Sequence, residues 1–410
     1  MEWYVYVSWA LIVTQVLFSL LTLKNYWFAL TKYERERREY APRVALIVPC
    51  RDLDADFEQN ISSFYRQDYE DYTLWFVVGD AQDAAYSALC KLKDRLTGDT
   101  RAKDVRVLVS GPGQTCSQKV HNLLYAYRQI PDDTDSAGSP QVEVLAFADS
   151  DICVRPTWLR HLVHPLRLES RGAASGYRWF VPKANNFATL ALSAMNAKIA
   201  QLLGNTSFNH AWGGSMVIKV QTFRELGIDK IWQKAVSDDL SLSCAVKDAH
   251  KKVEFVPGCI VASYEATTWA KLFEFARRQF VITKVTAPQT WCFGLFSSAY
   301  AVLGLWGGAA MAVYAAVKHH PDVYLFTAVP VLFFAAQLTR AILRQSMASK
   351  LLKEDWPRMK VAAIADVALF WLWSPLMLAF IVSSAFGRTI RWRGIRYKLL
   401  GPTETIVLGP

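Results

Sequence analysis

The residues best suited to chemistry in this chain are two aspartates that follow an apolar segment. Asp149 and Asp151 flank Ser150 and come directly after residues 142–148. Side chains two positions apart in an extended chain point the same way, so the two carboxylates repel each other unless a cation lies between them. Mg²⁺ or Mn²⁺ prefers such oxygen ligands, shared with a substrate diphosphate. A D-x-D pair is also common in turns, but its position after a predicted buried strand favours a metal site.

A second candidate group follows the Gly-Pro-Gly loop at residues 111–113. Lys119, His121 and Asn122 open the helix expected after this loop. A lysine at a helix N-terminus suits a phosphate, because the free backbone N–H groups and the helix dipole attract negative charge. A solvated surface lysine fits the same pattern, and both interpretations stand at this point.

Two adjacent acids, Asp238 and Asp239, follow Ser237. Adjacent side chains on a regular element point in different directions. One acid can therefore face a crevice as a general base while the other anchors the start of a helix. Removing the proton of an alcohol needs such a base within hydrogen-bond reach. The alternative is a simple helix cap, since Ser and Asp both cap helices.

Two arginines, Arg277 and Arg278, lie near the end of a candidate amphipathic helix at residues 269–280. Their positive charge suits a leaving diphosphate. Alternatively, they extend along a membrane surface into the headgroup layer, as long basic side chains do.

The elements that position these residues follow from an alternation of segment types between residues 43 and 263. Short β-branched and aromatic segments alternate with polar segments that suit helices. This indicates βαβ units, hence one soluble α/β domain with a mostly parallel sheet. Ligands of such sheets bind at the carboxyl ends of the strands, and three predicted strands end in acids, at Asp52, Asp80 and Asp149. The predicted strands are 44–48, 72–78, 105–109 and 142–147, and the predicted helices are 57–66, 84–96 and 117–128.

Composition excludes several other classes of protein. The 410 residues carry 46 Lys and Arg against 36 Asp and Glu, a net charge of +10, and 52% are hydrophobic. A disordered chain needs far fewer apolar residues. Seven scattered Cys indicate reduced thiols instead of a disulfide framework or a zinc site. No dinucleotide-binding or P-loop motif is present. Basic residues concentrate beside apolar blocks, which favours anionic lipid over nucleic acid as a partner.

The first apolar block, residues 3–23, carries no charge and matches the roughly 20 residues that a membrane-spanning helix needs. A cleaved signal peptide is not supported, because no basic segment precedes the block and no A-x-A site follows it. The positive-inside rule places the basic residues after it in the cytoplasm. We therefore predict a transmembrane helix at 1–24 and a cytoplasmic domain at 25–284. The basic residues are Lys24, Lys32, Arg35, Arg37 and Arg38.

The region after residue 284 predicts about three membrane helices within residues 285–387 and a basic C-terminal tail at 388–410. Four spans in all would place that tail across the membrane from the soluble domain, whereas the positive-inside rule places both on one side. One apolar stretch, such as that around Pro375, would then be re-entrant or interfacial. The apolar stretches are 285–317, 323–339 and 361–386.

Two further features have two interpretations each. Asp366 is an intramembrane functional carboxylate, or it lies near the headgroups close to Lys360. Residues 184–203 predict a helix that lies on the bilayer as a ramp for a lipid acceptor, or one that packs in the core.

Taken in order along the chain, the motifs resemble those of the ceramide glucosyltransferase family, which comprises membrane-bound glycosyltransferases of the GT-A fold. The likeness covers nearly the whole chain, including both apolar regions. Each motif alone is weak, and the ordered set is specific. The motifs are P-x-R at 49–51, G-D at 79–80, Q-K-x-x-N at 118–122, F-A-D-S-D at 147–151, S-G-Y-R-W at 175–179, W-G-G-S-M at 212–216, S-D-D at 237–239, R-R-Q-F at 277–280 and W-R-G-x-R-Y at 392–397.

The resemblance implies a Rossmann-like GT-A fold with a mostly parallel sheet, and roles for individual residues. Asp80 would contact the uracil of a UDP-sugar, and Lys119 would approach its diphosphate. Asp149 and Asp151 would hold the nucleotide and a divalent metal, Mn²⁺ or Mg²⁺. Asp239 would be the base that activates the acceptor hydroxyl. Further donor-binding residues would be Arg51, Asn122, Arg277, Arg278 and Gln279, and acceptor-binding residues would be Trp212 and Asp238.

The family's closing motif, R/Q-x-x-R-W, is only partly present. Arg278 is kept, but Val281 and Ile282 stand where the R-W pair is expected. By this likeness Arg277 or Lys284 would have to replace the missing pair.

The function implied by the resemblance is inverting transfer of a sugar, glucose in the first place, from a UDP-sugar to a membrane lipid. Ceramide is the first candidate acceptor and glucosylceramide the product. The alternatives are transfer to diacylglycerol or a hopanoid, and a processive polysaccharide synthase, which would need more membrane helices and an intact R-W pair. A membrane scaffold without catalysis would not explain acids at three strand ends.

Overall fold

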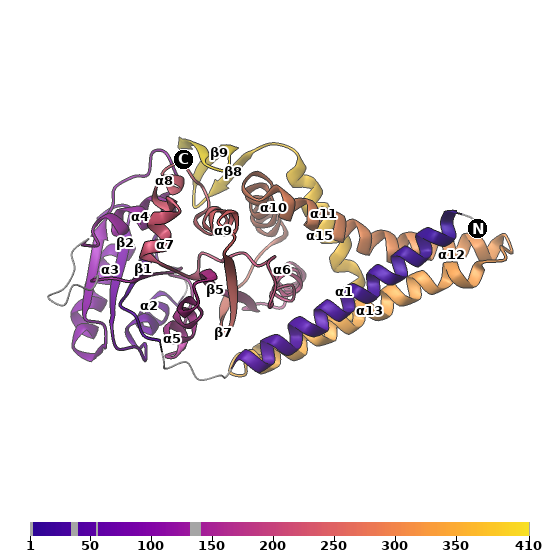
Figure 1. Cartoon of the computed structure of the whole chain (residues 1–410), viewed down its shortest axis with the longest axis horizontal. Coiled ribbons are helices and arrows are strands. Elements are labelled where there is room, and N and C mark those ends of the chain that lie inside the picture. The colour runs from indigo at the N-terminus through magenta and orange to yellow at the C-terminus, as the bar shows by residue number, and fades with distance from the viewer. Residues whose placement is uncertain (1–2, 34–39, 55, 132–140, 410) are drawn as a thin grey trace.

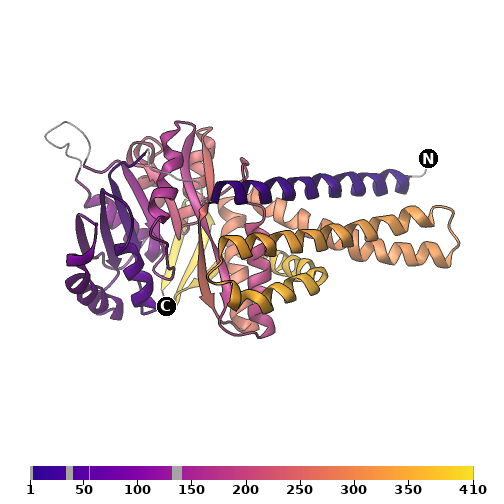
Figure 2. The ribbon, with the colours of Figure 1, turned by 90° about the horizontal axis from the view of Figure 1, so that it is seen from below.

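The protein consists of an α/β body and a bundle of apolar helices that projects from it, as the computed structural model shows (Figures 1 and 2). The structure describes residues 3–33, 40–54, 56–131 and 141–409. Three of the basic residues used to predict orientation, Arg35, Arg37 and Arg38, lie outside the described residues.

A seven-stranded mixed sheet forms the centre of the body, in the order β3-β2-β1-β4-β6-β5-β7. The first four strands of this order are parallel to one another, and β5 is parallel to β7. Strand β6 runs antiparallel to both of its neighbours. The predicted α/β fold of the GT-A type, with membrane helices on both sides of it in the chain, is confirmed. The strands are β1 (Val44–Pro49), β2 (Tyr72–Val78), β3 (Asp104–Val109), β4 (Val144–Ala148), β5 (Arg171–Pro182), β6 (Ser215–Lys219) and β7 (Lys252–Glu265).

Both faces of the sheet are covered by helices, because its strands are apolar at successive positions. Val44, Leu46 and Val48 of β1 pack into one core, and Ala45 and Ile47 pack into the core on the opposite face. The two-residue period of a strand requires this division. The first core includes α2 (Phe57–Tyr65), α3 (Ala84–Leu96) and α5 (Trp158–Val163), and the second includes α4 (Gln118–Arg128), α7 (Val220–Glu225), α8 (Ile228–Trp232) and α9 (Asp238–Asp248).

Three helices of the described chain are long and apolar enough to cross a membrane. Helix α1 continues past the predicted boundary at residue 24, because its end is held by the body. Asn25 donates a hydrogen bond to the Leu202 carbonyl at 3.1 Å, and the Tyr33 hydroxyl donates to the Leu351 carbonyl at 2.8 Å. They are α1 (Trp3–Tyr33), the continuous helical segment Pro288–Val317 and α13 (Val323–Leu351). The middle segment consists of α11 (Pro288–Val302), a π-helical turn at Leu303–Gly307 and α12 (Gly308–Val317).

The last apolar stretch is bent instead of straight. Helices α14 (Trp356–Ala368) and α15 (Phe370–Ala385) meet at an angle of 86°. The chain then returns to the body, where the basic tail forms an antiparallel sheet of β8 (Thr389–Trp392), β9 (Ile395–Gly401) and β10 (Glu404–Gly409). The Gln118 N–H at the start of α4 donates to the Tyr397 hydroxyl of β9 at 3.3 Å. The tail therefore lies on the same side of the membrane helices as the body, which removes the conflict seen in the sequence.

The helix within residues 184–203 and the Asp366 side chain, each of which had two interpretations, are both buried. Helix α6 (Phe187–Ala200) is enclosed by β5, α10 (Trp269–Thr286), α14 and α15, so it is a core helix and the proposed ramp is wrong. The Asp366 side chain is fully buried, where it accepts hydrogen bonds from Arg344 and Gln345 of α13. Its carboxylate thus holds α14 against α13.

Candidate active site

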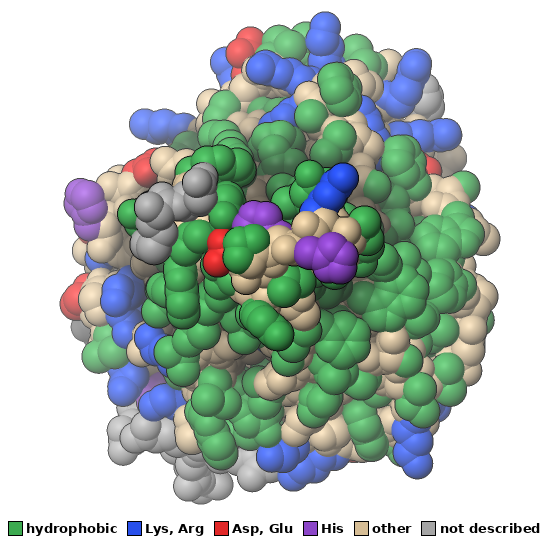
Figure 3. All heavy atoms as spheres, turned by 90° about the vertical axis from the view of Figure 1, so that its right-hand side faces the viewer, with side chains coloured by type: hydrophobic (Ala, Val, Ile, Leu, Met, Phe, Trp, Pro, Cys, Tyr) green, Lys and Arg blue, Asp and Glu red, His purple; other side chains and the backbone are tan. Residues whose placement is uncertain are grey.

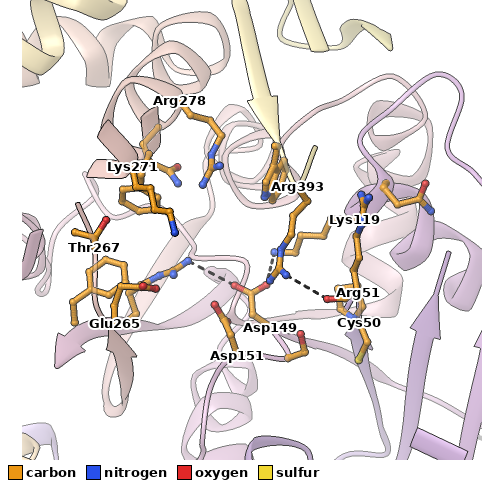
Figure 4. A pocket seen from close by; sticks show the side chains of 18 of the residues that line it. Cys50, Arg51, Lys119, Asp149, Asp151, Glu265, Thr267, Lys271, Arg278 and Arg393 are labelled. Carbon is orange, nitrogen blue, oxygen red and sulfur yellow. Dashed lines mark hydrogen bonds and ion pairs between the residues drawn. The ribbon is translucent and has the colours of Figure 1, made fainter. Parts of the chain in front are cut away.

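A cavity of about 360 Å³ lies where the carboxyl ends of β1 and β4 face α10 and the C-terminal sheet (Figure 4). This is the edge at which α/β sheets bind their ligands. The wall of the cavity combines charged side chains with an apolar side. It includes the basic residues Arg51, Lys119, Arg178, Lys271, Arg278 and Arg393, the acids Asp149, Asp151 and Glu265, and the apolar residues Phe180, Leu192, Leu272, Phe275 and Trp392.

Asp149 lies between two cations in this cavity. Its Oδ1 is 2.7 Å from Nζ of Lys119, and its Oδ2 is 3.8 Å from the guanidinium of Arg178. Burial by itself would raise the pKa of Asp149, but Lys119 and Arg178 hold it below its ordinary value. Asp149 is therefore ionised at neutral pH.

Asp151 lines the same cavity, and its buried Oδ1 has no hydrogen-bond partner among the described residues. Burial and the neighbouring Asp149 carboxylate raise the pKa of Asp151. A buried oxygen without a donor is costly, and a cation bound to it would remove that cost. Within the described ranges no three His, Cys, Asp or Glu side chains come together as a metal site. The pair therefore fits a divalent cation whose remaining ligands are substrate phosphate and water, as is usual for Mg²⁺.

Lys119 connects the two acidic motifs. Its Nζ is also 3.0 Å from Oδ2 of Asp238. Burial would lower the pKa of Lys119, but Asp149 and Asp238 raise it well above its ordinary value. The side chain is only 16% exposed, so the interpretation of Lys119 as a solvated surface residue is wrong.

The S-D-D motif begins α9. The Ser237 hydroxyl accepts a hydrogen bond from the Leu240 N–H at 3.2 Å, which makes it the helix cap. Asp239 accepts on Oδ1 from Ser237 and Leu240, and on Oδ2 from the Gly213 N–H at 3.1 Å. Burial raises the pKa of Asp238 against the pull of Lys119. Neither acid lines the cavity, although Asp238 is connected to it through Lys119.

The first glycine of the W-G-G-S-M motif, Gly213, is required for steric reasons. A Cβ on Gly213 would lie 2.3 Å from Oδ2 of Asp238 and 2.7 Å from Nζ of Lys119. Only glycine lets the backbone approach the ion pair so closely.

The C-terminal sheet contributes a cation that sequence reasoning missed. Arg393 occupies the hairpin turn between β8 and β9 with a φ of 48°, followed by Gly394 with a φ of 82°, as such turns require. Its guanidinium lies 2.8 and 3.0 Å from the two carboxylate oxygens of Asp54 and donates to the Arg51 carbonyl at 3.3 Å. The W-R-G-x-R-Y motif signals the turn, but not that the turn reaches the cavity.

The two arginines of α10 have different surroundings. Arg278 lines the cavity, with its guanidinium over the rings of Phe275 and Trp392, and burial lowers its pKa to about 10. Arg277 donates to the carbonyls of Phe386 and Thr389, at 2.7 and 3.3 Å. Arg277 is thus not a cavity residue, and its predicted contact with the donor is not supported.

Lys284, the other residue considered for the missing R-W pair, donates to the carbonyls of Ser384, Ala385 and Gly387. Arg277 and Lys284 together fasten the segment that leads into the C-terminal sheet. Neither replaces the missing pair in the cavity.

The remaining predicted residues divide into two groups. Arg51, Asn122 and Gln279 line the cavity. Asp80 does not: it is exposed, and its carboxylate accepts from the Gln82 N–H at 2.9 Å before α3 begins. Trp212 is also absent from the wall, because it is buried with its ring 4.9 Å from the Arg178 guanidinium.

Replacing Lys119 with Met leaves two buried carboxylates without their shared counter-charge. Removal of one partner from a buried ion pair lowers the free energy of unfolding by about 3–5 kcal/mol, so we expect a clearly lower Tm at about pH 8. Without Lys119, burial raises the pKa of both carboxylates above that in the unfolded chain, so the folded state binds more protons and stability should partly recover at about pH 5. Thermal unfolding in detergent at both pH values measures this.

The matched control is Lys103→Met, which removes an exposed ion pair with Asp71 at 2.6 Å and should cost less than about 1 kcal/mol. Equal losses in the two variants, or a Lys119→Met loss that does not change with pH, would contradict the role given to Lys119.

Comparison with known proteins adds two kinds of likeness. The sequence matches the family model for glycosyl transferase family 21 over residues 7–404. The mannosyltransferase PcManGT from Pyrobaculum calidifontis, solved with GDP-Man and Mn²⁺, is 16% identical, with a TM-score of 0.45 and coverage of 92% of this chain and 97% of that chain. GalNAc-T7, solved with UDP, GalNAc and Mn²⁺, is 11% identical, with a TM-score of 0.39 and coverage of 61% of this chain and 52% of that chain.

The family match begins within α1 and ends in β10, so the cavity and both membrane regions fall inside it. The chain therefore belongs to glycosyl transferase family 21, a family of sugar-transferring enzymes.

Proposed function

We propose that this protein is an inverting glycosyltransferase that moves glucose from UDP-glucose to the hydroxyl of ceramide, giving glucosylceramide. The observation that supports this is the two-sided cavity, which is charged at the sheet and apolar beside the helices next to the membrane region. A charged sugar donor needs the charged side, and a lipid acceptor needs an apolar side next to it.

The charged half suits the donor diphosphate. Lys119, Arg278 and Arg393 reach it from three separate elements, and in Figure 4 they lie above and to the right of Asp149 and Asp151. Guanidinium groups match phosphate oxygens in pairs. We assign to Arg393 and Trp392 the part of the missing R-W pair, because they line the cavity beside Arg278. A divalent cation on Asp149 and Asp151 would neutralise diphosphate charge as the leaving group departs.

The apolar half suits the acceptor. Leu192 of α6 and Leu272 and Phe275 of α10 form this side. Beside it, Phe187 and Trp269 are 43% and 46% exposed and their rings pack together at the edge of the body. The acyl chains can thus remain in the bilayer while the hydroxyl-bearing headgroup enters the cavity.

The proposed base is Asp239. Asp149 and Asp238 are both paired with Lys119, whereas Oδ2 of Asp239 accepts one hydrogen bond among the described residues, from the Gly213 N–H. A carboxylate oxygen has two lone pairs, so this oxygen has one acceptor position left for a hydroxyl proton. Asp239 does not line the cavity wall, so the proposal requires the acceptor hydroxyl to extend beyond this wall to reach it. One base without a covalent nucleophile agrees with inversion.

We further propose that the body faces the cytoplasm. Lys24 and Lys32 at the body end of α1 follow the positive-inside rule. None of the seven cysteines, all of which the structure describes, forms a disulfide, as a reducing compartment allows.

A donor and acceptor panel tests the function. Purified protein in mixed micelles is given UDP-glucose, UDP-galactose or GDP-mannose with ceramide, diacylglycerol or a hopanoid, and products are identified by mass spectrometry. We expect a single hexose on ceramide, from UDP-glucose. A ladder of added hexoses would instead indicate the processive synthase, and transfer to another lipid alone would reject ceramide.

Substituting the two acids of S-D-D separates their roles. Asp239→Asn keeps the side-chain shape but removes the base, so kcat should fall at least about a hundredfold while the KM for the donor changes little. Asp238→Asn removes a partner of Lys119, so its effect should appear mainly as a raised donor KM. Steady-state kinetics with varied UDP-glucose measures both. The reverse pattern would make Asp238 the base.

Metal dependence follows from the unpartnered Asp151 oxygen. Wild-type activity should be lost in EDTA and restored by Mn²⁺ or Mg²⁺. Asp151→Asn should retain the wild-type Tm, lose most turnover, and no longer show a Mn²⁺-dependent rise of Tm in the presence of UDP. Full activity of a metal-free preparation would exclude this assignment.

A further inference from the structure

A second cavity, of about 230 Å³, lies beside the body end of α1 and shares no residue with the active-site cavity. Lys32 of α1 reaches it from one side. His164 and Arg167 of the 3₁₀ turn His164–Arg167 line it, together with Arg171 at the start of β5. None of these residues lines the active-site cavity.

The charge balance in this cavity is positive. Arg171 is neutralised by Glu254 of β7, at 2.8 Å. Lys32 and Arg167 have no acidic group within 4.0 Å in the part of the chain that the structure describes. Among the described residues these two cations thus lack counter-charges, and such a pair at one cavity attracts an anion.

The cavity lies beyond the uncharged part of α1, on the side of the body. Lys32 is eight residues beyond Lys24, where the uncharged part of α1 ends, which is roughly 12 Å along a helix. Leu168 in the cavity wall is 43% exposed, and Trp27, next to the wall residue Phe28 in sequence, is 57% exposed. Figure 3 shows Lys and Arg side chains around the rim of the apolar face from which the membrane helices project.

The position of Lys32 is fixed by the neighbouring residue. Arg155 donates to the Tyr33 hydroxyl and to the Leu351 carbonyl, and its guanidinium lies 5.0 Å from the Tyr33 ring. The end of α1 is therefore held against the body, and the cavity is a formed site instead of a loose surface patch.

We propose that this cavity binds the phosphate-bearing headgroup of an anionic membrane lipid. The cations of Lys32 and Arg167 would pair with the phosphate, and Phe28 and Leu168 in the cavity wall would contact the glycerol and the first carbons of the chains. A soluble phosphate would use the same cations but would gain nothing from the apolar residues.

Native mass spectrometry of the full-length protein in detergent tests this proposal. Phosphatidylglycerol and phosphatidylcholine are titrated separately, and inorganic phosphate is added in a third series. We expect the wild type to bind one phosphatidylglycerol at least about tenfold more tightly than phosphatidylcholine, and Lys32→Gln/Arg167→Gln to lose this preference. Inorganic phosphate should not displace the lipid at comparable concentration.

The control variant is Lys24→Gln/Lys360→Gln, which removes two exposed cations near the apolar helices that do not line the cavity. It should keep the preference. Loss of preference in both variants, or in neither, overturns the proposal, because the effect would then be diffuse or absent. Displacement by inorganic phosphate overturns the lipid assignment. If the double variant does not fold, Arg167→Gln is tested alone, because the Arg167 side chain is exposed and its replacement should not affect folding.

Discussion

One buried ammonium group holds the catalytic edge of this protein together. Nζ of Lys119 lies within 3.0 Å of both Asp149 and Asp238, which belong to motifs on different elements. A buried charge is tolerated only when paired, so the end of β4 and the starts of α4 and α9 must converge on this point. Gly213 is required because any side chain there would collide with the same pair.

A second constraint connects the membrane region to the cavity. Because α14 and α15 are bent by 86°, the chain comes back to the body after its last apolar stretch. Arg277 and Lys284 hold the returning segment through backbone carbonyls. The hairpin that follows delivers Arg393 to the cavity. The basic tail is thus a part of the site, and the same helix that fastens it, α10, also presents Arg278.

The electrostatics of the cavity are unbalanced in a way that suggests its ligand. Asp149 is satisfied by Lys119 and Arg178, while Asp151 keeps a buried oxygen without a donor. Arg278 is desolvated enough to lower its pKa to about 10. A donor carrying a diphosphate and a cation would pair both kinds of unsatisfied group at once, which is the physical basis of the proposed reaction.

The sequence by itself determined the elements and the acidic motifs. Strands β1 to β4, helices α2 to α4 and the membrane-length stretches all follow from local periodicity and charge, which neighbouring residues set without reference to the rest of the chain. Asp149 and Asp151 line one cavity because both follow the same strand, β4, whereas Asp52 and Asp80, which follow β1 and β2, do not line it. Tertiary structure alone decided which basic residues reach that cavity. Arg277 and Arg278 are adjacent in sequence, yet one points to the tail and the other to the site, and Arg393 arrives from more than 200 residues beyond Asp149. Such choices depend on contacts between distant segments, which no local pattern encodes; the burial of α6 and the side of the C-terminal tail depend on them too.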